Sequence, residues 1–220
     1  MNNDDLFRNG DKILQEIEAK LDYTPKVLLQ CCCAPCSSYC IKELTNYFDL
    51  YLLYYNPNIS PVEEYTKRKN ELIRFVNEFP HKNKIEIIDC DYDGEEFFDM
   101  AKGMEMLKEG GERCFKCYNL RLEKAAQMAK EMGMDYFCTT LTLSPLKSSY
   151  IINKIGNDLQ NKYQVKYLFS DFKKRNGYLE SIKLSKEYNL YRQDYCGCIY
   201  SKRDRDLKKR EKEEQLEIAS

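Results

Sequence analysis

The chain has 220 residues, of which 43% are hydrophobic and 32% are charged, with a formal net charge of −1. This length and composition suit one α/β domain with a buried core, so we expect a single metal-binding catalytic domain over residues 1–220. No apolar run approaches the roughly 20 residues of a membrane span, and the polar residues 1–5 do not resemble a signal peptide. The sequence therefore predicts a cytoplasmic protein with no membrane partner.

The first half of the chain alternates between predicted helices and strands. Apolar residues at helical spacing predict a helix over residues 6–21 within an N-terminal extension, residues 1–25. Further helices are expected at residues 35–47, 62–79 and 95–107. Short runs rich in aliphatic and aromatic residues predict strands at 26–31, 49–55 and 84–90.

The second half continues this alternation. Helices are expected at residues 118–132, 147–160 and 178–188, strands at 136–140 and 165–169, and a charged C-terminal helix at 201–220. This order predicts an α/β fold in which a parallel sheet of about five strands has helices on both faces, as in Rossmann-like proteins. Ligands in such folds bind at the carboxyl ends of the strands.

Eight of the eleven cysteines lie in three clusters: Cys-Cys-Cys-Ala-Pro-Cys at 31–36, Cys-Phe-Lys-Cys at 114–117, and Cys-Gly-Cys at 196–198. Thiolates bind zinc and iron–sulfur clusters, and the C-x-x-C spacing lets two sulfurs reach one metal centre. The metal-ligand candidates are Cys32, Cys33, Cys36, Cys114 and Cys117. Spacing alone leaves zinc and iron–sulfur open.

The other cysteines and the single histidine have simpler interpretations. Cys40, Cys90 and Cys138 have no clustered partner, and free cysteine is a common small core residue. A chain of this length does not need disulfides to fold, which favours metal binding or catalysis in a reducing compartment. His81 lies in a polar turn and is expected at the surface.

Positive charge is concentrated near the third cluster. Residues 171–210 contain twelve Lys or Arg and six Asp or Glu, a local charge of +6, which leaves −7 for the remainder. Lys and Arg can contact RNA phosphates, but most charge runs are solvated helix faces. Both interpretations stay open for Lys173, Lys174 and Arg175 and for residues 202–210.

Several longer motifs resemble the QueH-type, cobalamin-independent epoxyqueuosine reductases, and they occur in order from about residue 26 to 201. These are Leu-Leu-Gln-Cys-Cys-Cys-Ala-Pro-Cys at 28–36, Tyr-Asn-Pro-Asn-Ile at 55–59, Glu-Arg-Cys-Phe-Lys-Cys-Tyr at 112–118, Thr-Thr-Leu at 139–141, Ser-Pro at 144–145 and Tyr-Arg-Gln-Asp-Tyr-Cys-Gly-Cys at 191–198. The resemblance implies an oxidoreductase that reduces the epoxide of epoxyqueuosine, at the wobble position of tRNA, in the last step of queuosine biosynthesis.

The resemblance also implies cofactors and residue roles. A [4Fe–4S] cluster would be held by Cys32, Cys33, Cys114 and Cys117, and Cys196 and Cys198 would form a redox-active pair. An adjacent mononuclear iron belongs to the family pattern, and its ligand candidates here are Cys36, Asp194 and the third-cluster cysteines.

The reaction also needs protons, electrons and tRNA contacts. Proton-donor candidates are Tyr191, Tyr195 and Asp194, and an unidentified partner must supply electrons. Candidate tRNA contacts are Lys173, Lys174, Arg175 and Arg192. The chain departs from the family at Gln30 and Cys31, where the family commonly has His and an apolar residue. We expect Cys31 to be a buried bystander.

Two other functions are compatible with a cysteine-rich α/β domain. A non-catalytic zinc-binding module predicts a colourless protein without redox activity. A tRNA sulfur-transfer or nucleotide-activating enzyme on a similar scaffold would need a phosphate-binding Gly- or Ser-rich loop after the first strand. Residues 31–36 occupy that position instead, which argues against such an enzyme.

Overall fold

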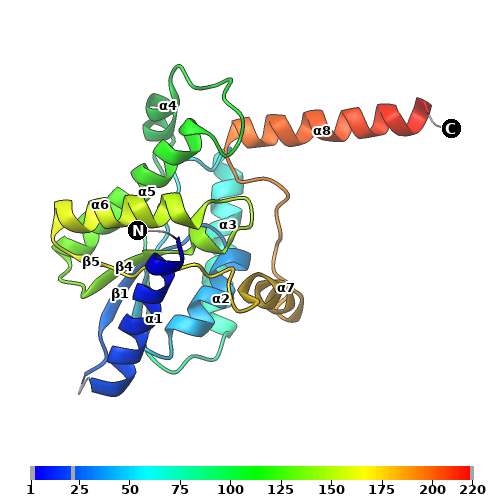
Figure 1. Ribbon diagram of the computed structural model, residues 1–220. Coiled ribbons are helices and arrows are strands. Elements are labelled where there is room, and N and C mark those ends of the chain that lie inside the picture. The colour runs from blue at the N-terminus through cyan, green and yellow to red at the C-terminus, as the bar shows by residue number, and fades with distance from the viewer. Residues whose placement is uncertain (1–2, 21–22, 219–220) are drawn as a thin grey trace.

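A five-stranded parallel sheet forms the centre of the computed structural model, which describes residues 3–20 and 23–218. The strand order is β3-β2-β1-β4-β5, and each neighbouring pair is parallel (Figure 1). The strands are β1 (Lys26–Gln30), β2 (Asp49–Leu53), β3 (Ile85–Ile88), β4 (Tyr136–Thr139) and β5 (Lys166–Tyr167). The predicted α/β class with a five-stranded parallel sheet is therefore confirmed.

Helices cover both faces of this sheet. They are α1 (Asn3–Lys20), α2 (Ala34–Leu44), α3 (Val62–Glu78), α4 (Glu95–Ala101), α5 (Glu112–Glu131), the short 3-10 helix η1 (Thr140–Leu143), α6 (Ser149–Tyr163), α7 (Gly177–Glu187) and α8 (Ile199–Ile218). Most of the α-helices begin and end within a few residues of the sequence-based prediction, because most of them follow a clear apolar periodicity.

The middle strand β1 divides the hydrophobic core into two layers. Val27 and Leu29 pack into the layer that includes buried residues of α2, α3 and α7. Leu28 points the other way, into the layer formed with α5 and α6. All three side chains are fully buried. Helices cover both faces of a parallel sheet, so a strand in its middle is apolar at successive positions and does not alternate between apolar and polar residues.

The second cysteine cluster differs from the prediction in its secondary structure. The helix expected from residue 118 begins at Glu112, so Cys114 and Cys117 lie in its first turns. The preceding helix, expected to reach residue 107, ends at Ala101, and Gly103 follows with a φ of 78°. In the segment after α4, the Arg113 side chain donates hydrogen bonds to the backbone carbonyl oxygens of Met104 and Leu107. These bonds hold the segment in place of a continued helix.

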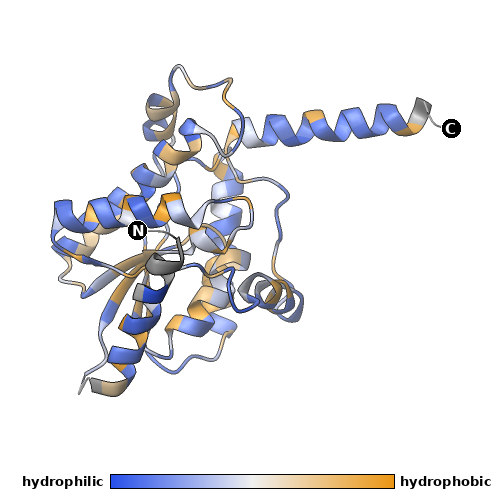
Figure 2. Ribbon diagram, viewed as in Figure 1, coloured by the Kyte–Doolittle hydropathy of each residue, from blue (hydrophilic) through white to orange (hydrophobic). Residues whose placement is uncertain are grey.

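The C-terminal helix α8 projects away from the sheet and is polar along most of its length (Figures 1 and 2). It is anchored at its start, where Tyr200 and Ser201 are buried. Over residues 3–20 and 23–218, every helix is too short or too polar to cross a membrane.

Candidate metal and redox site

The first cysteine cluster lies at the carboxyl end of β1. The strand order changes direction between β1 and β4, and ligands of open α/β sheets bind at such a switch point. Cys32, Cys33 and Cys36 have their sulfur atoms within 4.8 Å of one another, and the sulfurs of Cys32 and Cys33 are 3.7 Å apart. Cys33 has extended backbone angles and α2 begins at the next residue, which turns Cys36 back toward the pair. These three residues could hold a metal ion.

The environment favours negative charge on one member of this cysteine trio. Hydrogen bonds with Cys33 and Cys36 lower the pKa of the Cys32 thiol well below its ordinary value, and the positive charges of Arg121 and Lys147 lower it further. The same hydrogen bond to Cys32 raises the pKa of Cys33 to about 12. One thiolate is thus shared among three sulfurs, which is a suitable starting point for binding a soft metal.

A buried polar network lies under the first cluster. The Gln30 side chain donates hydrogen bonds to the carbonyl oxygens of Cys31, at 3.1 Å, and Tyr55, at 3.0 Å. It accepts a hydrogen bond from the hydroxyl of Thr139 at 3.0 Å, and Asn56 donates to the same Cys31 carbonyl at 2.9 Å. The network joins the ends of β1, β2 and β4 and fixes the backbone from which the cysteine loop starts.

The second cluster presents its two sulfurs on one face of α5. Cys114 and Cys117 are three residues apart, a spacing that places side chains side by side on a helix. The Cys114 sulfur accepts a hydrogen bond from the Gly110 backbone N–H at 3.2 Å. Cys117 is buried in a small hydrophobic cluster that also contains Cys198, and this burial raises the pKa of the Cys117 thiol to about 12.

The third cluster lies between α3 and the start of α8. The Gly197 carbonyl accepts a hydrogen bond from the Ser60 backbone N–H at 3.0 Å. Gly197 has a φ of 128°, and a Cβ atom at this position would lie 3.1 Å from Nη1 of Arg68. This position therefore requires glycine. Cys198 is buried, and its sulfur accepts a hydrogen bond from the Ser201 N–H at 3.4 Å.

One face of α3 holds the segment that leads into the third cluster. Arg68 donates a hydrogen bond to the Cys196 carbonyl at 3.1 Å. Glu71 accepts one from the Tyr191 backbone N–H at 2.7 Å, and Glu64 accepts one from the Tyr191 hydroxyl at 3.2 Å. These three α3 residues follow at intervals of four and three positions, so they share one helix face.

A cleft of about 910 Å³ joins the first and third clusters, and Cys32, Cys36 and Cys196 line it. Ten Lys or Arg residues and four Asp or Glu residues also line this cleft, so it attracts anions. Five of the ten cations come from α8: Arg203, Arg205, Lys208, Lys209 and Lys212. Neither Cys114 nor Cys117 is among the lining residues.

Three buried arginines around the cysteines were not predicted from the sequence. Arg68, Arg113 and Arg121 are each 1% exposed, and each has at least one buried side-chain nitrogen without a hydrogen-bond partner. A buried cation is costly unless an anion compensates it. These residues therefore suit an anionic group such as a thiolate-bound iron–sulfur cluster. Arg113 and Arg121 lie four residues before and four residues after Cys117 on α5, and that helical spacing is the signal available in the sequence.

The proton-donor candidates Asp194, Tyr191 and Tyr195 are not part of the cysteine trio. The Asp194 carboxylate pairs with Arg205 and with Lys209, at 2.8 Å from the latter. The hydrogen bond from Lys209 is the largest effect that lowers the pKa of Asp194, and the charges of Arg205 and Lys209 lower it further. The Tyr195 ring lies against the guanidinium groups of Arg68 and Arg205, at 5.1 Å and 4.9 Å.

The predicted tRNA contacts are in different places. Arg192 lines the cleft. Lys173, Lys174 and Arg175 do not. The ammonium group of Lys173 binds the Thr142 carbonyl at 2.9 Å and pairs with Asp171 at 3.0 Å, which ties it to the loop after β4. Arg175 pairs with Asp11 of α1 at 2.7 Å.

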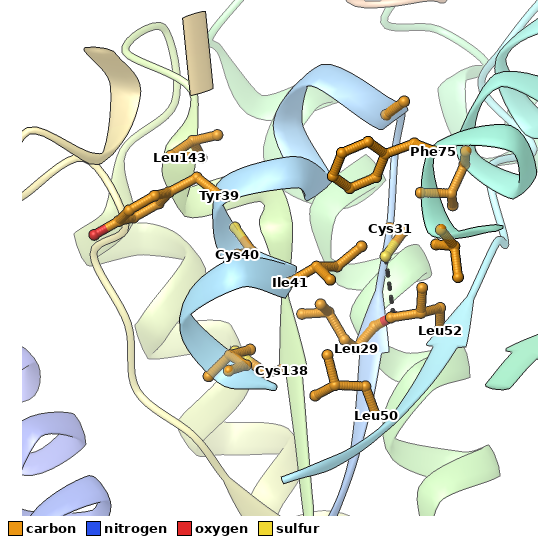
Figure 3. Close-up of a cluster of buried hydrophobic side chains, with 14 of the residues drawn as sticks. Leu29, Cys31, Tyr39, Cys40, Ile41, Leu50, Leu52, Phe75, Cys138 and Leu143 are labelled. Atoms are coloured by element: carbon orange, nitrogen blue, oxygen red, sulfur yellow. Dashed lines mark hydrogen bonds between the residues drawn. The ribbon is translucent and has the colours of Figure 1, made fainter. Parts of the chain in front are cut away.

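The remaining cysteines lie where core packing places them. Cys31, Cys40 and Cys138 are fully buried among apolar side chains, and the Cys31 sulfur points to the Leu29 carbonyl at 3.5 Å (Figure 3). Cys90 is half-buried at the edge of the other core layer. His81 is exposed, as predicted.

Comparisons with known proteins place this chain in a family. The family model described as epoxyqueuosine reductase QueH matches residues 27–204. An epoxyqueuosine reductase QueH of Staphylococcus epidermidis is 44% identical over 200 residues, covering 88% of this chain and 84% of its own length. The Streptococcus pyogenes protein of that name is 43% identical, covering 88% and 78%, and the Thermotoga maritima protein is 37% identical, covering 86% and 95%. With a match that includes all three cysteine clusters, the chain belongs to the epoxyqueuosine reductase QueH family.

Proposed function

We propose that this protein is a cytoplasmic, single-domain oxidoreductase that reduces the epoxide of epoxyqueuosine in tRNA to the alkene of queuosine. Family membership supports this activity. The observation that carries it is the meeting of Cys32, Cys36 and Cys196 in one cation-lined cleft. In the reaction two C–O bonds break and a C=C bond forms. Two electrons and two protons are taken up, and the oxygen leaves as water.

Cys32, Cys33, Cys114 and Cys117 are the residues that would hold a [4Fe–4S] cluster, with Cys36 available for an adjacent iron. The donor chemistry fits, because these thiols lie near buried arginines without full hydrogen-bond partners. When bound, the cluster would supply electrons singly and the adjacent iron would polarise a C–O bond. Over the described residues, only the trio of the first cluster has its sulfurs within 4.8 Å of one another.

Cys196 and Cys198 are the proposed redox pair. Cys196 lines the cleft, where substrate would lie, whereas Cys198 is buried in the same hydrophobic cluster as Cys117. A dithiol releases two electrons and two protons when it becomes a disulfide, and an electron donor must then reduce it again. Gly197 allows the turn between the two cysteines, and the Arg68 contact with the Cys196 carbonyl fixes its position.

Asp194 suits a role as an anionic ligand better than one as a proton donor. Its pairing with Lys209 and Arg205 lowers the pKa of the carboxyl, so it stays ionised and holds no proton to give at neutral pH. The Tyr191 hydroxyl donates a hydrogen bond to Glu64. Burial is the main cause that raises the pKa of this hydroxyl, and the negative charge of Glu64 raises it further. Tyr195 lies closer to the cleft, which it lines, and is the preferred proton-donor candidate.

The tRNA substrate fits the charge of the cleft. Phosphates are bound by Lys and Arg side chains, and bases in RNA loops are read in single strands. Arg192 and the α8 cations line the same cleft as Cys32, Cys36 and Cys196. A free nucleoside would lack these contacts and should react poorly.

The test is anaerobic conversion of tRNA that carries epoxyqueuosine, by protein reconstituted with iron and sulfide and supplied with a strong reductant. We expect a brown protein whose colour bleaches on reduction, and queuosine in the digested tRNA. A colourless protein that holds zinc and leaves the epoxide unchanged would support a zinc-binding module instead.

A further inference from the structure

The side chain of Arg121 is buried, lines the cleft and has no carboxylate partner among the described residues. It is 1% exposed. Its Nη2 donates a hydrogen bond to the side-chain oxygen of Asn56 at 2.6 Å, and its Nε has no hydrogen-bond partner. Removing a guanidinium group from water is strongly unfavourable unless an anion lies close to it. The neutral amide of Asn56 does not supply that charge.

The groups that can supply it are the cysteines. Arg121 follows Cys117 by one turn of α5, so the two side chains lie on the same helix face. Arg121 also lines the cleft together with Cys32 and Cys196. It is therefore placed between the first cluster, which follows β1, and the second cluster, on α5.

Asn56 determines where the guanidinium points. The Asn56 side chain is itself buried and donates to the Cys31 carbonyl at 2.9 Å. Its oxygen also accepts a hydrogen bond from Gln30 at 3.3 Å. The network that fixes the first cysteine loop thus also holds Arg121, and the free Nε–H remains available to a sulfur.

The other two buried arginines have structural partners that Arg121 lacks. Arg68 forms an ion pair with Glu64 at 2.7 Å. Arg113 donates to the carbonyls of Met104, Glu105 and Leu107. Of the three, Arg121 is the one with neither an ion pair nor a set of backbone carbonyl acceptors among the described residues.

We propose that Arg121 is a positioning residue of the metal site, whose positive charge and free N–H stabilise the thiolates of Cys32 and Cys117 when they bind metal. This inference rests on the proposed function for the identity of the metal. For a [4Fe–4S] cluster it has a definite consequence. Reduction adds negative charge, so a nearby buried cation favours the reduced form and raises the reduction potential.

The main variant is Arg121→Gln, which removes the charge but keeps a side chain able to bind Asn56. Its reconstituted cluster should have a reduction equilibrium less favourable by at least tenfold, which equals a fall of about 59 mV for one electron. Arg121→Lys should restore most of the wild-type potential. Lys130→Gln, which removes an exposed charge from the far end of the same helix, should leave the potential unchanged. The measurement is a redox titration followed by electron paramagnetic resonance.

A second variant covers the case in which Arg121→Gln does not fold. Asn56→Asp keeps the size of the side chain and places a carboxylate against the guanidinium. This neutralises Arg121 without removing it, so the potential should again fall below that of wild type. Equal potentials for the wild type and this variant would overturn the inference.

Metal affinity distinguishes this inference from the proposed function. Zn²⁺ affinity is measured on metal-free protein by competition with a chromophoric chelator. Arg121→Gln should weaken Zn²⁺ binding at least tenfold relative to Lys130→Gln, because the counter-charge acts on thiolates whatever metal they hold. A wild-type protein that assembles no iron–sulfur cluster would defeat the proposed reductase centre, and this comparison would still test Arg121. Equal Zn²⁺ affinities of the two variants would show that Arg121 acts only through packing.

Discussion

At the scale of single residues, neighbouring cysteines differ because of where the backbone turns them. Cys31 ends the apolar run of β1 and points into the core, where burial raises the pKa of its thiol. Cys32 points the opposite way, into the cleft, where hydrogen bonds from its neighbours lower the pKa. Alternation of side chains along an extended backbone separates Cys31 from Cys32. Cys33 joins the trio where the chain turns into α2.

This distinction between core cysteines and ligand candidates predicts the outcomes of three cysteine variants. Cys32→Ser and Cys114→Ser should each lose most of the bound iron, because a hydroxyl is a poor ligand for a soft metal. Cys196→Ser should keep the iron and lose turnover. Iron and sulfide analysis, the visible spectrum and tRNA conversion are the measurements.

Cys90→Ser is the matched control for these variants, because Cys90 is half-buried at the core edge next to Met128. It should keep both iron and activity. Equal iron loss in the Cys90 and Cys114 variants would show that the assignment of ligands and core cysteines is wrong.

At the scale of elements, α3 acts as the support for the third cluster. Besides Arg68 and Glu71, its Arg74 donates a hydrogen bond to the Tyr188 carbonyl at 2.9 Å, at the start of the segment that leads to Cys196. The Lys67 ammonium lies 3.5 Å from the centre of the Tyr191 ring. A loop with little regular structure is thus held by side chains of one helix, at spacings of three and four residues.

Glu71→Gln should weaken this support. It removes the charge from the acceptor of the Tyr191 N–H and of Arg74, at a cost of about 1–3 kcal/mol in the free energy of unfolding at neutral pH. Hydrogen bonding by Arg74 lowers the pKa of Glu71 below its ordinary value of 4.5. The stabilisation is therefore present above pH 4.5, and it is lost as the pH falls through the lowered pKa of the folded state.

Urea unfolding of both proteins between neutral and acidic pH measures this difference, which should shrink as Glu71 becomes protonated. Glu78→Gln is the control, since the Glu78 side chain is 47% exposed and also pairs with Arg74. It should cost at most about 1 kcal/mol. A Glu71 variant as stable as the Glu78 variant at neutral pH would remove α3 from this role.

At the scale of the whole molecule, the cleft is assembled from segments far apart in sequence. The end of β1, the loop after β4, the third-cluster segment and α8 all contribute residues to it. α8 is a polar helix with little buried surface beyond its first turns (Figure 2). A helix that is polar on all faces is surrounded by solvent or contacts a polar binding partner. Its cations beside the cysteines make tRNA phosphates a suitable partner.

Lys208→Glu combined with Lys212→Glu tests this surface. Both residues are exposed, lie one helical turn apart and line the cleft. The double variant should bind tRNA at least about tenfold more weakly and show a shallower dependence of affinity on salt, because fewer counterions are released. Iron content should not change. The measurement is a binding titration at several salt concentrations.

Lys130→Glu combined with Lys166→Glu makes the same charge change at exposed positions outside the cleft. Matching affinities and salt slopes in the two double variants would make α8 an ordinary solvated helix. Reversal of Lys173 is a poorer test, because Lys173 is bound to the Thr142 carbonyl and to Asp171 and its loss would disturb the loop after β4.

The sequence by itself determined the fold class, most elements and the three cysteine clusters. Apolar periodicity and strand-like runs are patterns of residues a few positions apart in the sequence, and so are the C-x-x-C and Cys-Gly-Cys spacings. The long motifs also identified the family that the comparisons confirm.

Only the tertiary structure decided which side chains meet. Arg68, Arg113 and Arg121 were not singled out from the sequence, yet each is 1% exposed. Lys173 and Arg175 were candidate tRNA contacts, and the structure adds contacts of Lys173 with Thr142 and of Arg175 with Asp11, which join segments far apart in the chain. Burial and charge pairing depend on contacts between residues far apart in the chain, and no local pattern encodes these contacts.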